Sequence, residues 1–265
     1  MPRLARCPVA VVSLVFWVVV AMPWLRAADG AIANHPAAPT SYILVGFAGG
    51  FVRHDNPRHG PVRLAQRIRQ NLSAGDTIEV FENRHRRAAY NQILRLLDSN
   101  HDGVLSSQEK SQAHIILFGH SWGASAVVLL SRDLNRAGIP VLLTVQVDSV
   151  EKPWQRDKVI PDNVAEAANF YQPHGLVHGR AQITAADDAK TQILGNYRFD
   201  YQKNPVQCQG ASWFQHLFTP SHMQSDCDPR LWSQVEGIVR QRMQPQMTTV
   251  EAIPSSASSS QSLNR

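Results

Sequence analysis

Residues 115–126 read Ile-Ile-Leu-Phe-Gly-His-Ser-Trp-Gly-Ala-Ser-Ala, and this stretch decides the fold. Its first four residues are wholly apolar, which predicts a short buried strand. Its small residues at the other end open a helix that we expect over residues 124–135. Between strand and helix, the segment from Gly119 to Gly123 matches the pattern G-x-S-x-G. This pattern forms a sharp strand-to-helix turn that exposes its serine, so Ser121 is the candidate nucleophile.

Strand and helix patterns alternate on both sides of this turn. We expect strands over residues 41–45, 77–81, 141–147 and 181–184, and helices over residues 61–72, 87–97 and 164–170. A final helix begins at Pro229, with Asp228 as its N-cap. Strands that alternate with helices predict an α/β fold, with a mostly parallel sheet of about five or six strands and helices on both faces.

The net charge of +5 depends mainly on the N-terminus of this 265-residue chain. Residues 1–28 contain Arg3, Arg6 and Arg26 and no acidic residue, so 23 basic and 21 acidic residues remain in the rest. A nucleic-acid-binding protein would keep its basic excess in the folded part. The charge distribution therefore argues against a nucleic-acid partner.

Residues 1–28 also have the pattern of an export signal, with basic residues, an apolar stretch and then small residues. The apolar stretch from Cys7 to Leu25 is long enough to serve instead as an uncleaved membrane anchor. Both interpretations place the folded domain, residues 40–243, outside the cytoplasm, where it would be secreted, periplasmic or anchored. The serine-rich composition of residues 244–265 predicts a disordered tail.

Two cysteines, Cys208 and Cys227, remain once the export signal is set aside. In an oxidising compartment, an isolated pair most simply forms a disulfide. The alternative is a pair of buried free thiols.

Residues 98–109 match the calcium-loop pattern D-x-[DN]-x-[DN]-G-x5-E at every specified position. Calcium prefers clustered oxygen ligands, which such a loop supplies from side chains and one backbone carbonyl. The expected ligands are Asp98, Asn100, Asp102, Val104 through its carbonyl, Ser106 and Glu109. The loop connects the second helix to the strand before Ser121, so we expect structural calcium and no organic cofactor. A solvated loop without metal is the alternative.

With the turn at Ser121, residues 40–243 resemble the α/β-hydrolase superfamily, whose members are mostly serine esterases, lipases, thioesterases and peptidases. One strand precedes the first helix, so the chain looks like a minimal member. The resemblance implies an oxyanion hole that contains the amide after the nucleophile, here that of Trp122. It also implies an amide from the loop after an early strand, where Phe47 or Ala48 is the expected donor.

The resemblance further implies the chain order serine, acid, histidine, with the histidine on the loop before the final helix. His222 lies shortly before that helix and within the span between the two cysteines, so it is the expected base. His216 is the alternative base. His120, next to the nucleophile, is expected to pack within the turn.

Asp148 is our candidate for the acid. It ends the strand over residues 141–147, at the same edge of the sheet as Ser121, and the ligand chemistry of open α/β sheets gathers at that edge. The alternatives are Asp187 and Asp188, which occupy the commoner superfamily position, and then Asp200.

Together these features predict an exported, calcium-stabilised serine hydrolase that acts on a small-molecule carboxylic ester or thioester. A non-catalytic, calcium-binding scaffold or binding protein on the same fold is the alternative from a different class. A peptidase or an acyltransferase would use the same apparatus. The sequence does not identify the substrate or the oligomeric state, and membrane contact is expected only if the N-terminal segment stays uncleaved.

Overall fold

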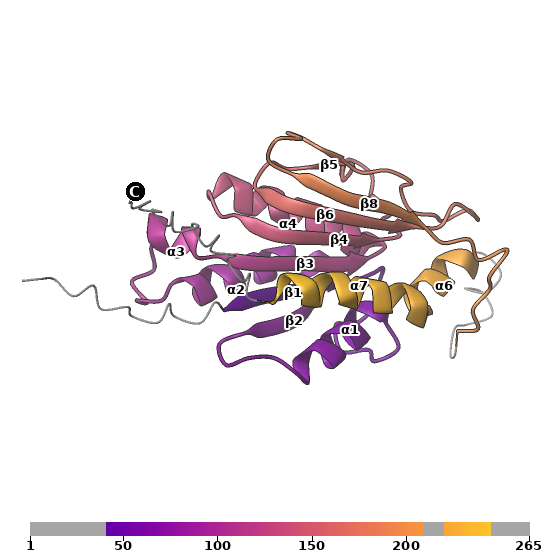
Figure 1. Ribbon diagram of the computed structural model, residues 1–265, viewed down its shortest axis with the longest axis horizontal. Coiled ribbons are helices and arrows are strands. Elements are labelled where there is room, and N and C mark those ends of the chain that lie inside the picture. The colour runs from indigo at the N-terminus through magenta and orange to yellow at the C-terminus, as the bar shows by residue number, and fades with distance from the viewer. Residues whose placement is uncertain (1–40, 209–219, 245–265) are drawn as a thin grey trace, which may run out of the picture. The chain divides into compact units, whose positions relative to one another are not determined.

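A six-stranded sheet forms the centre of the computed structural model, which describes residues 41–208 and 220–244 (Figure 1). The strands lie in the order β2-β1-β3-β4-β6-β8, and every neighbouring pair is parallel. The bounds are Tyr42–Ala48 for β1, Thr77–Glu82 for β2, His114–His120 for β3, Val141–Val147 for β4, Val164–Tyr171 for β6 and Gln192–Arg198 for β8. The predicted α/β fold with a mostly parallel sheet is therefore confirmed. The expected export signal, the alternative base His216 and tail residues 245–265 lie outside the described residues.

Helices cover both faces of this sheet. One face packs against α1 (Gly60–Arg69) and α7 (Pro229–Arg242), and α7 crosses in front of the sheet in Figure 1. The other face packs against α2 (Arg86–Leu97) and α4 (Trp122–Arg136). Because successive side chains of a strand point to opposite faces, Ile115 and Leu117 of β3 belong to the second core, while Ile116 and Phe118 belong to the first. A strand covered on both faces has no polar side, which explains the unbroken apolar run.

The chain between β4 and α7 differs from the prediction. The segment expected as a helix near residues 164–170 is the strand β6, buried between β4 and β8. Its alanines and its glutamate favour a helix in isolation, but packing between two strands overrides this local preference. The strand expected over residues 181–184 is only β7 (Thr184–Ala185), which pairs with β5 (Val159–Ile160) in a separate two-stranded sheet. The sequence analysis missed β8, which lies at one edge of the sheet.

The segment before α7 contains a short helix, α6 (Pro220–Cys227), so His222 lies on a helix and not on a loop as expected. Asp228 then caps α7 as predicted, since its side chain accepts a hydrogen bond from the amide of Arg230. Among the described residues, no helix combines the length and apolarity needed to cross a bilayer.

Cys208 and Cys227 form a disulfide, as predicted, with their Cα atoms 5.7 Å apart. The bond ties the chain after β8 to the last residue of α6, the helix that carries His222. The disulfide therefore restrains the segment that delivers His222 to the sheet.

Replacement of both cysteines, in a Cys208→Ser/Cys227→Ser variant, should lower the free energy of unfolding by about 3 kcal/mol. The bond spans 19 residues of sequence, and a disulfide that closes a loop of this size restricts the unfolded chain by about that amount. Denaturant unfolding of the oxidised wild type and of the variant measures the difference. Two reactive thiols in the unreduced wild-type protein would contradict the bond itself.

Candidate active site

Ser121 occupies the tight turn between β3 and α4. Its backbone angles, φ 58° and ψ −127°, belong to a region that residues other than glycine rarely adopt. A Cβ atom at Gly119 would lie 2.5 Å from the carbonyl oxygen of Gly123, and one at Gly123 would lie 2.3 Å from the carbonyl oxygen of Phe47. Both distances are shorter than any tolerable contact, so the turn requires glycine at both positions.

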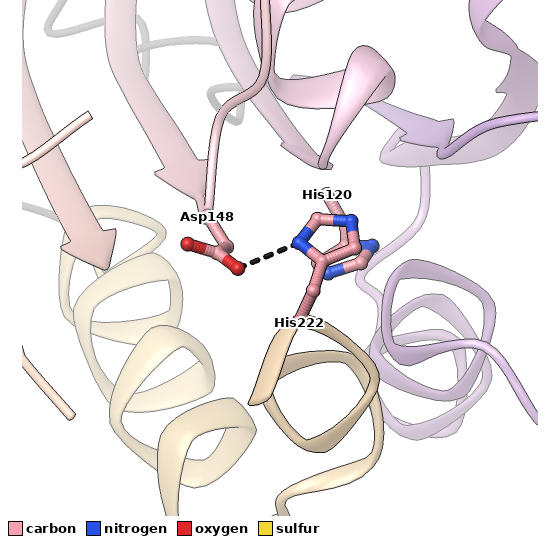
Figure 2. Close-up of side chains that lie close together, drawn as sticks. All are labelled: His120, Asp148 and His222. Atoms are coloured by element: carbon pink, nitrogen blue, oxygen red, sulfur yellow. Dashed lines mark hydrogen bonds and ion pairs between the residues drawn. The ribbon is translucent and has the colours of Figure 1, made fainter. Parts of the chain in front are cut away.

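A chain of two hydrogen bonds connects Ser121, His222 and Asp148. The distance between His222 Nε2 and Ser121 Oγ is 2.9 Å, and that between His222 Nδ1 and Asp148 Oδ2 is 2.7 Å. Figure 2 shows the second of these, between an aspartate that follows β4 and a histidine on α6. All three side chains are buried. The structure therefore brings the predicted nucleophile, base and acid together at the carboxyl edge of the sheet.

Asp148 is held as an ionised carboxylate. It is fully buried and accepts hydrogen bonds from the amides of Gln172 (3.3 Å) and Gly179, and from Gln172 Nε2 (3.0 Å). Burial acts to raise the pKa of Asp148, but the hydrogen bond and charge of His222 and the hydrogen bond from Gln172 outweigh it, so the pKa is lowered. An ionised carboxylate at this position favours the proton on His222 Nδ1, which leaves the lone pair of Nε2 directed at Ser121.

Two of the three alternative acids have other partners, and the third is exposed. Asp187 accepts a hydrogen bond from the amide of Ala189 and lies 3.8 Å from the ammonium of Lys190. Asp188 is exposed. Asp200 lies 3.1 Å from His174 Nε2. The geometry favours Asp148 because it is the aspartate that contacts His222.

The two backbone segments expected to form an oxyanion hole pass each other beside Ser121. Trp122 is the first residue of α4, so its amide has no carbonyl partner in a preceding turn. Phe47 and Ala48 are the last two residues of β1. A Cβ atom at Gly49, the next residue, would lie 2.9 Å from Ser121 Cβ. The end of β1 is thus in contact with the nucleophile.

Asn83 and Lys152 join these two segments, and the sequence analysis missed both. Asn83, in the short helix η1 (Asn83–His85), donates from Nδ2 to the carbonyl oxygens of Ala48 (3.3 Å) and Gly50. Lys152 Nζ donates to Asn83 Oδ1 (2.6 Å) and lies 4.8 Å from the centre of the Trp122 ring. The separation of 69 residues between Asn83 and Lys152 leaves no local pattern to detect.

The segment predicted to bind calcium, residues 98–109, is ordered by its own hydrogen bonds. The Asp98 carboxylate accepts from the amides of Asp102 (3.2 Å) and Gly103 (3.0 Å). Gly103 has a φ of 79°, as the sharp turn requires, and the partly buried Leu105 packs against the core. The loop therefore has the sharp turn at Gly103 that the calcium-loop pattern predicts, and its Asp98 carboxylate is held by backbone amides of the same loop.

Glu109, the expected bidentate ligand, has protein partners in this structure. Its carboxylate accepts hydrogen bonds from the amides and the hydroxyls of Ser99 and Ser106, and it completes a capping box at the start of α3 (Ser107–Ser111). The hydrogen bonds from Ser106 and Ser99 lower the pKa of Glu109 to about 2. The donor types of the loop fit calcium, but bidentate ligation requires Glu109 to turn away from the two serines.

Among the histidine, cysteine, aspartate and glutamate side chains that the structure describes, His120, Asp148 and His222 form a group whose possible metal-ligand atoms lie within 4.8 Å of one another. That cluster belongs to the candidate active site itself, where the hydrogen bond between His222 Nδ1 and Asp148 Oδ2 already occupies one possible ligand atom of each residue.

Comparisons with known proteins return similarities of fold. No family model matches the sequence, and no curated protein matches it. Solved structures with a similar fold include esterase B from Lactobacillus rhamnosis (TM-score 0.42, 10% identity, 78% of this chain and 76% of that chain). They also include human thioesterase 2 (TM-score 0.39, 10% identity, 76% of this chain and 95% of that chain). A third is a cutinase-like protein from Cryptococcus sp. (TM-score 0.37, 16% identity, 78% of this chain and 97% of that chain). The all-parallel strand order, the helices on both faces and the serine at the turn after β3 give this chain a minimal α/β-hydrolase fold.

Proposed function

We propose that this protein is an exported serine hydrolase that cleaves a small-molecule carboxylic ester or thioester. The observation that carries this proposal is the hydrogen-bonded chain from Ser121 Oγ through His222 to Asp148. A serine hydroxyl bonded to an imidazole that a buried carboxylate orients is the arrangement that nucleophilic acyl transfer needs. Its position at the carboxyl edge of a parallel sheet is where ligands approach such folds.

In the proposed reaction, Ser121 Oγ attacks the carbonyl carbon of the substrate while His222 Nε2 takes the hydroxyl proton. The Asp148 carboxylate stabilises the resulting imidazolium. The amide of Trp122, together with that of Phe47 or Ala48, stabilises the negative charge on the carbonyl oxygen. His222 then gives its proton to the leaving alcohol or thiol. Water attacks the acyl-serine by the same route, which releases the carboxylic acid and restores Ser121.

Export is supported by the disulfide between Cys208 and Cys227, because such bonds persist in oxidising compartments and are rare in reducing ones. The expected signal or anchor in residues 1–28 would direct the chain there.

Calcium is proposed as a structural ligand of residues 98–109. The loop leads into α3 and then directly into β3, the strand that carries the nucleophile turn. When bound, calcium would supply charge neutralisation among the loop's carboxylates. Asp98, Asn100, Asp102, Ser106, Glu109 and the carbonyl of Val104 would hold it.

Replacement of Ser121 by alanine should lower ester hydrolysis by about 10⁴-fold or more, since removal of the nucleophile abolishes the covalent route. Hydrolysis of p-nitrophenyl esters and labelling by a fluorophosphonate probe measure the loss, and an unchanged melting temperature shows that the fold is intact. A wild-type protein that neither hydrolyses esters nor takes up the probe would favour the non-catalytic scaffold.

Replacement of Asp148 by asparagine should lower kcat by about 10³- to 10⁴-fold, because the neutral amide no longer holds the required tautomer of His222. The matched controls are Asp187→Asn and Asp188→Asn, which remove the same charge and should keep wild-type activity. Loss of activity in either control, with activity kept in Asp148→Asn, would transfer the acid to the commoner superfamily position.

Removal of calcium by EDTA should lower the melting temperature more than it lowers activity per folded molecule. A ligand that binds only the native state stabilises it by about 2.7 kcal/mol at a hundredfold excess over Kd. The matched variant is Glu109→Gln, which can keep the capping box but loses the charged ligand, and it should respond little to calcium. An identical melting curve for the wild type in EDTA and in calcium would refute this role.

A further inference from the structure

One face of α6 carries three buried side chains, His222, Ser225 and Asp226, at the helical spacing i, i+3 and i+4. The proposed reaction uses only His222. Ser225 is 1% exposed and Asp226 is 3% exposed, so neither side chain is accessible to solvent or to a substrate. Two buried polar side chains beside the base therefore have no role in the mechanism as described.

Both side chains meet His120, the residue before the nucleophile. The distance between His120 Nε2 and Ser225 Oγ is 3.1 Å, and that between His120 Nδ1 and Asp226 Oδ1 is 3.6 Å. The second distance is too long for a hydrogen bond but short enough for the negative charge of Asp226 to act on the imidazole ring. The sequence of groups repeats that of Ser121, His222 and Asp148. Because Ser225 is closed to substrate, this second set can act only through the first.

The two sets are in direct contact. The imidazole rings of His120 and His222 stack, with their centres 4.8 Å apart and their planes at 28°, as Figure 2 shows. Ser225 Oγ also lies 2.7 Å from the carbonyl oxygen of His222 and 3.3 Å from Asp148 Oδ2. A single hydroxyl thus contacts the base, the acid and the stacked imidazole.

His120 is neutral at pH 7. Burial lowers the pKa of His120 to about 4, although the Asp226 charge opposes this shift. A neutral imidazole has one N–H group. Since the Asp226 carboxylate faces Nδ1, the proton is favoured there, and Nε2 and the carbonyl oxygen of His222 are then alternative acceptors for the one proton of the Ser225 hydroxyl.

Asp226 is ionised and contacts the start of α1. Burial acts to raise the pKa of Asp226, but His120, His59 and the amide of Gly60 lower it to about 2. His59 Nδ1 lies 2.6 Å from Asp226 Oδ2, and the Gly60 amide donates to Oδ1 at 3.0 Å. Arg63, on α1, donates to the backbone carbonyl of Asp226.

We propose that His120, Ser225 and Asp226 are positioning residues for His222. They hold its ring against Ser121 and Asp148, and the Asp226 carboxylate favours the imidazolium that forms when His222 takes the serine proton. The charged and titratable groups that face His222 and Asp226 come from three other elements. They are Asp148 after β4, His120 at the end of β3, and His59 and Arg63 at the start of α1. The catalytic part of this inference rests on the proposed function, whereas the part that concerns protonation does not.

The first test measures the pKa of His222 by NMR of histidine-labelled protein, with His120→Gln and His222→Gln variants to assign the signals. In Asp226→Asn, the pKa of His222 should fall by about half a unit to one unit, because a nearby negative charge is removed. The control is Asp228→Asn, which removes a buried carboxylate two residues away and keeps the cap of α7. It should leave the pKa of His222 unchanged. An unchanged pKa in folded Asp226→Asn overturns the proposal.

A second measurement needs no variant of Asp226 and so remains decisive if that variant fails to fold. In the wild type, the nitrogen shifts of His120 should report a neutral ring with its proton on Nδ1 from about pH 5 to pH 9. A proton on Nε2, or titration of His120 near its ordinary pKa, would overturn the proposal.

Kinetics separate this inference from the proposed function. The acid limb of the kcat/KM profile in Asp226→Asn should move to lower pH together with the pKa of His222, while KM changes little. A wild type without hydrolase activity refutes the proposed function and leaves the NMR result to decide the positioning role. An active wild type with an unmoved acid limb in Asp226→Asn refutes the inference alone.

Discussion

The close passage of the β3–α4 turn against the end of β1 is the constraint on which the rest of the site depends. Phe47 pairs with Gly119 in the parallel register of β1 and β3, and Gly123 lies against the Phe47 carbonyl with no space for a side chain. This contact sets the amide of Trp122 and the end of β1 on either side of Ser121. A larger residue at Gly119 or Gly123 would push apart the β3–α4 turn and the end of β1, whose amides the proposed oxyanion hole requires.

The parallel sheet explains why the remaining groups come from distant parts of the chain. Carboxyl ends of parallel strands meet at one edge, so Asp148 after β4 and its partner Gln172 after β6 lie beside Ser121 after β3. No strand supplies the histidine. It comes from α6, which the disulfide and the contacts of Asp226 with the α1 segment attach to that edge. The site therefore depends on tertiary contacts that form only when the sheet and its covering helices are complete.

Local sequence patterns predicted the secondary structure correctly where the local preference of the sequence agrees with the fold. The apolar run before Ser121 and the helical spacing around it predicted β3 and α4, because these signals are independent of distant residues. They failed at β6, where a sequence with helix-forming residues becomes a strand only through its neighbours β4 and β8. They also failed to find Asn83 and Gln172, whose roles come from partners 69 and 24 residues away.

Burial of two ionised carboxylates beside one base has a physical consequence for the whole domain. A buried charge is tolerated only when hydrogen bonds and opposite charges replace its water, and both Asp148 and Asp226 have such partners. The pKa of Asp226 is about 2 in the fold against an ordinary 3.8, so its stabilising contribution is present above the ordinary value and is lost as the pH falls toward 2. The pKa of His120 is lowered from 6.5 to about 4, so acid already favours the unfolded chain in that higher range, where the unfolded state binds a proton that the fold does not. As the pH falls, the unfavourable protonation of His120 thus weakens the fold at a higher pH than the protonation of Asp226 does.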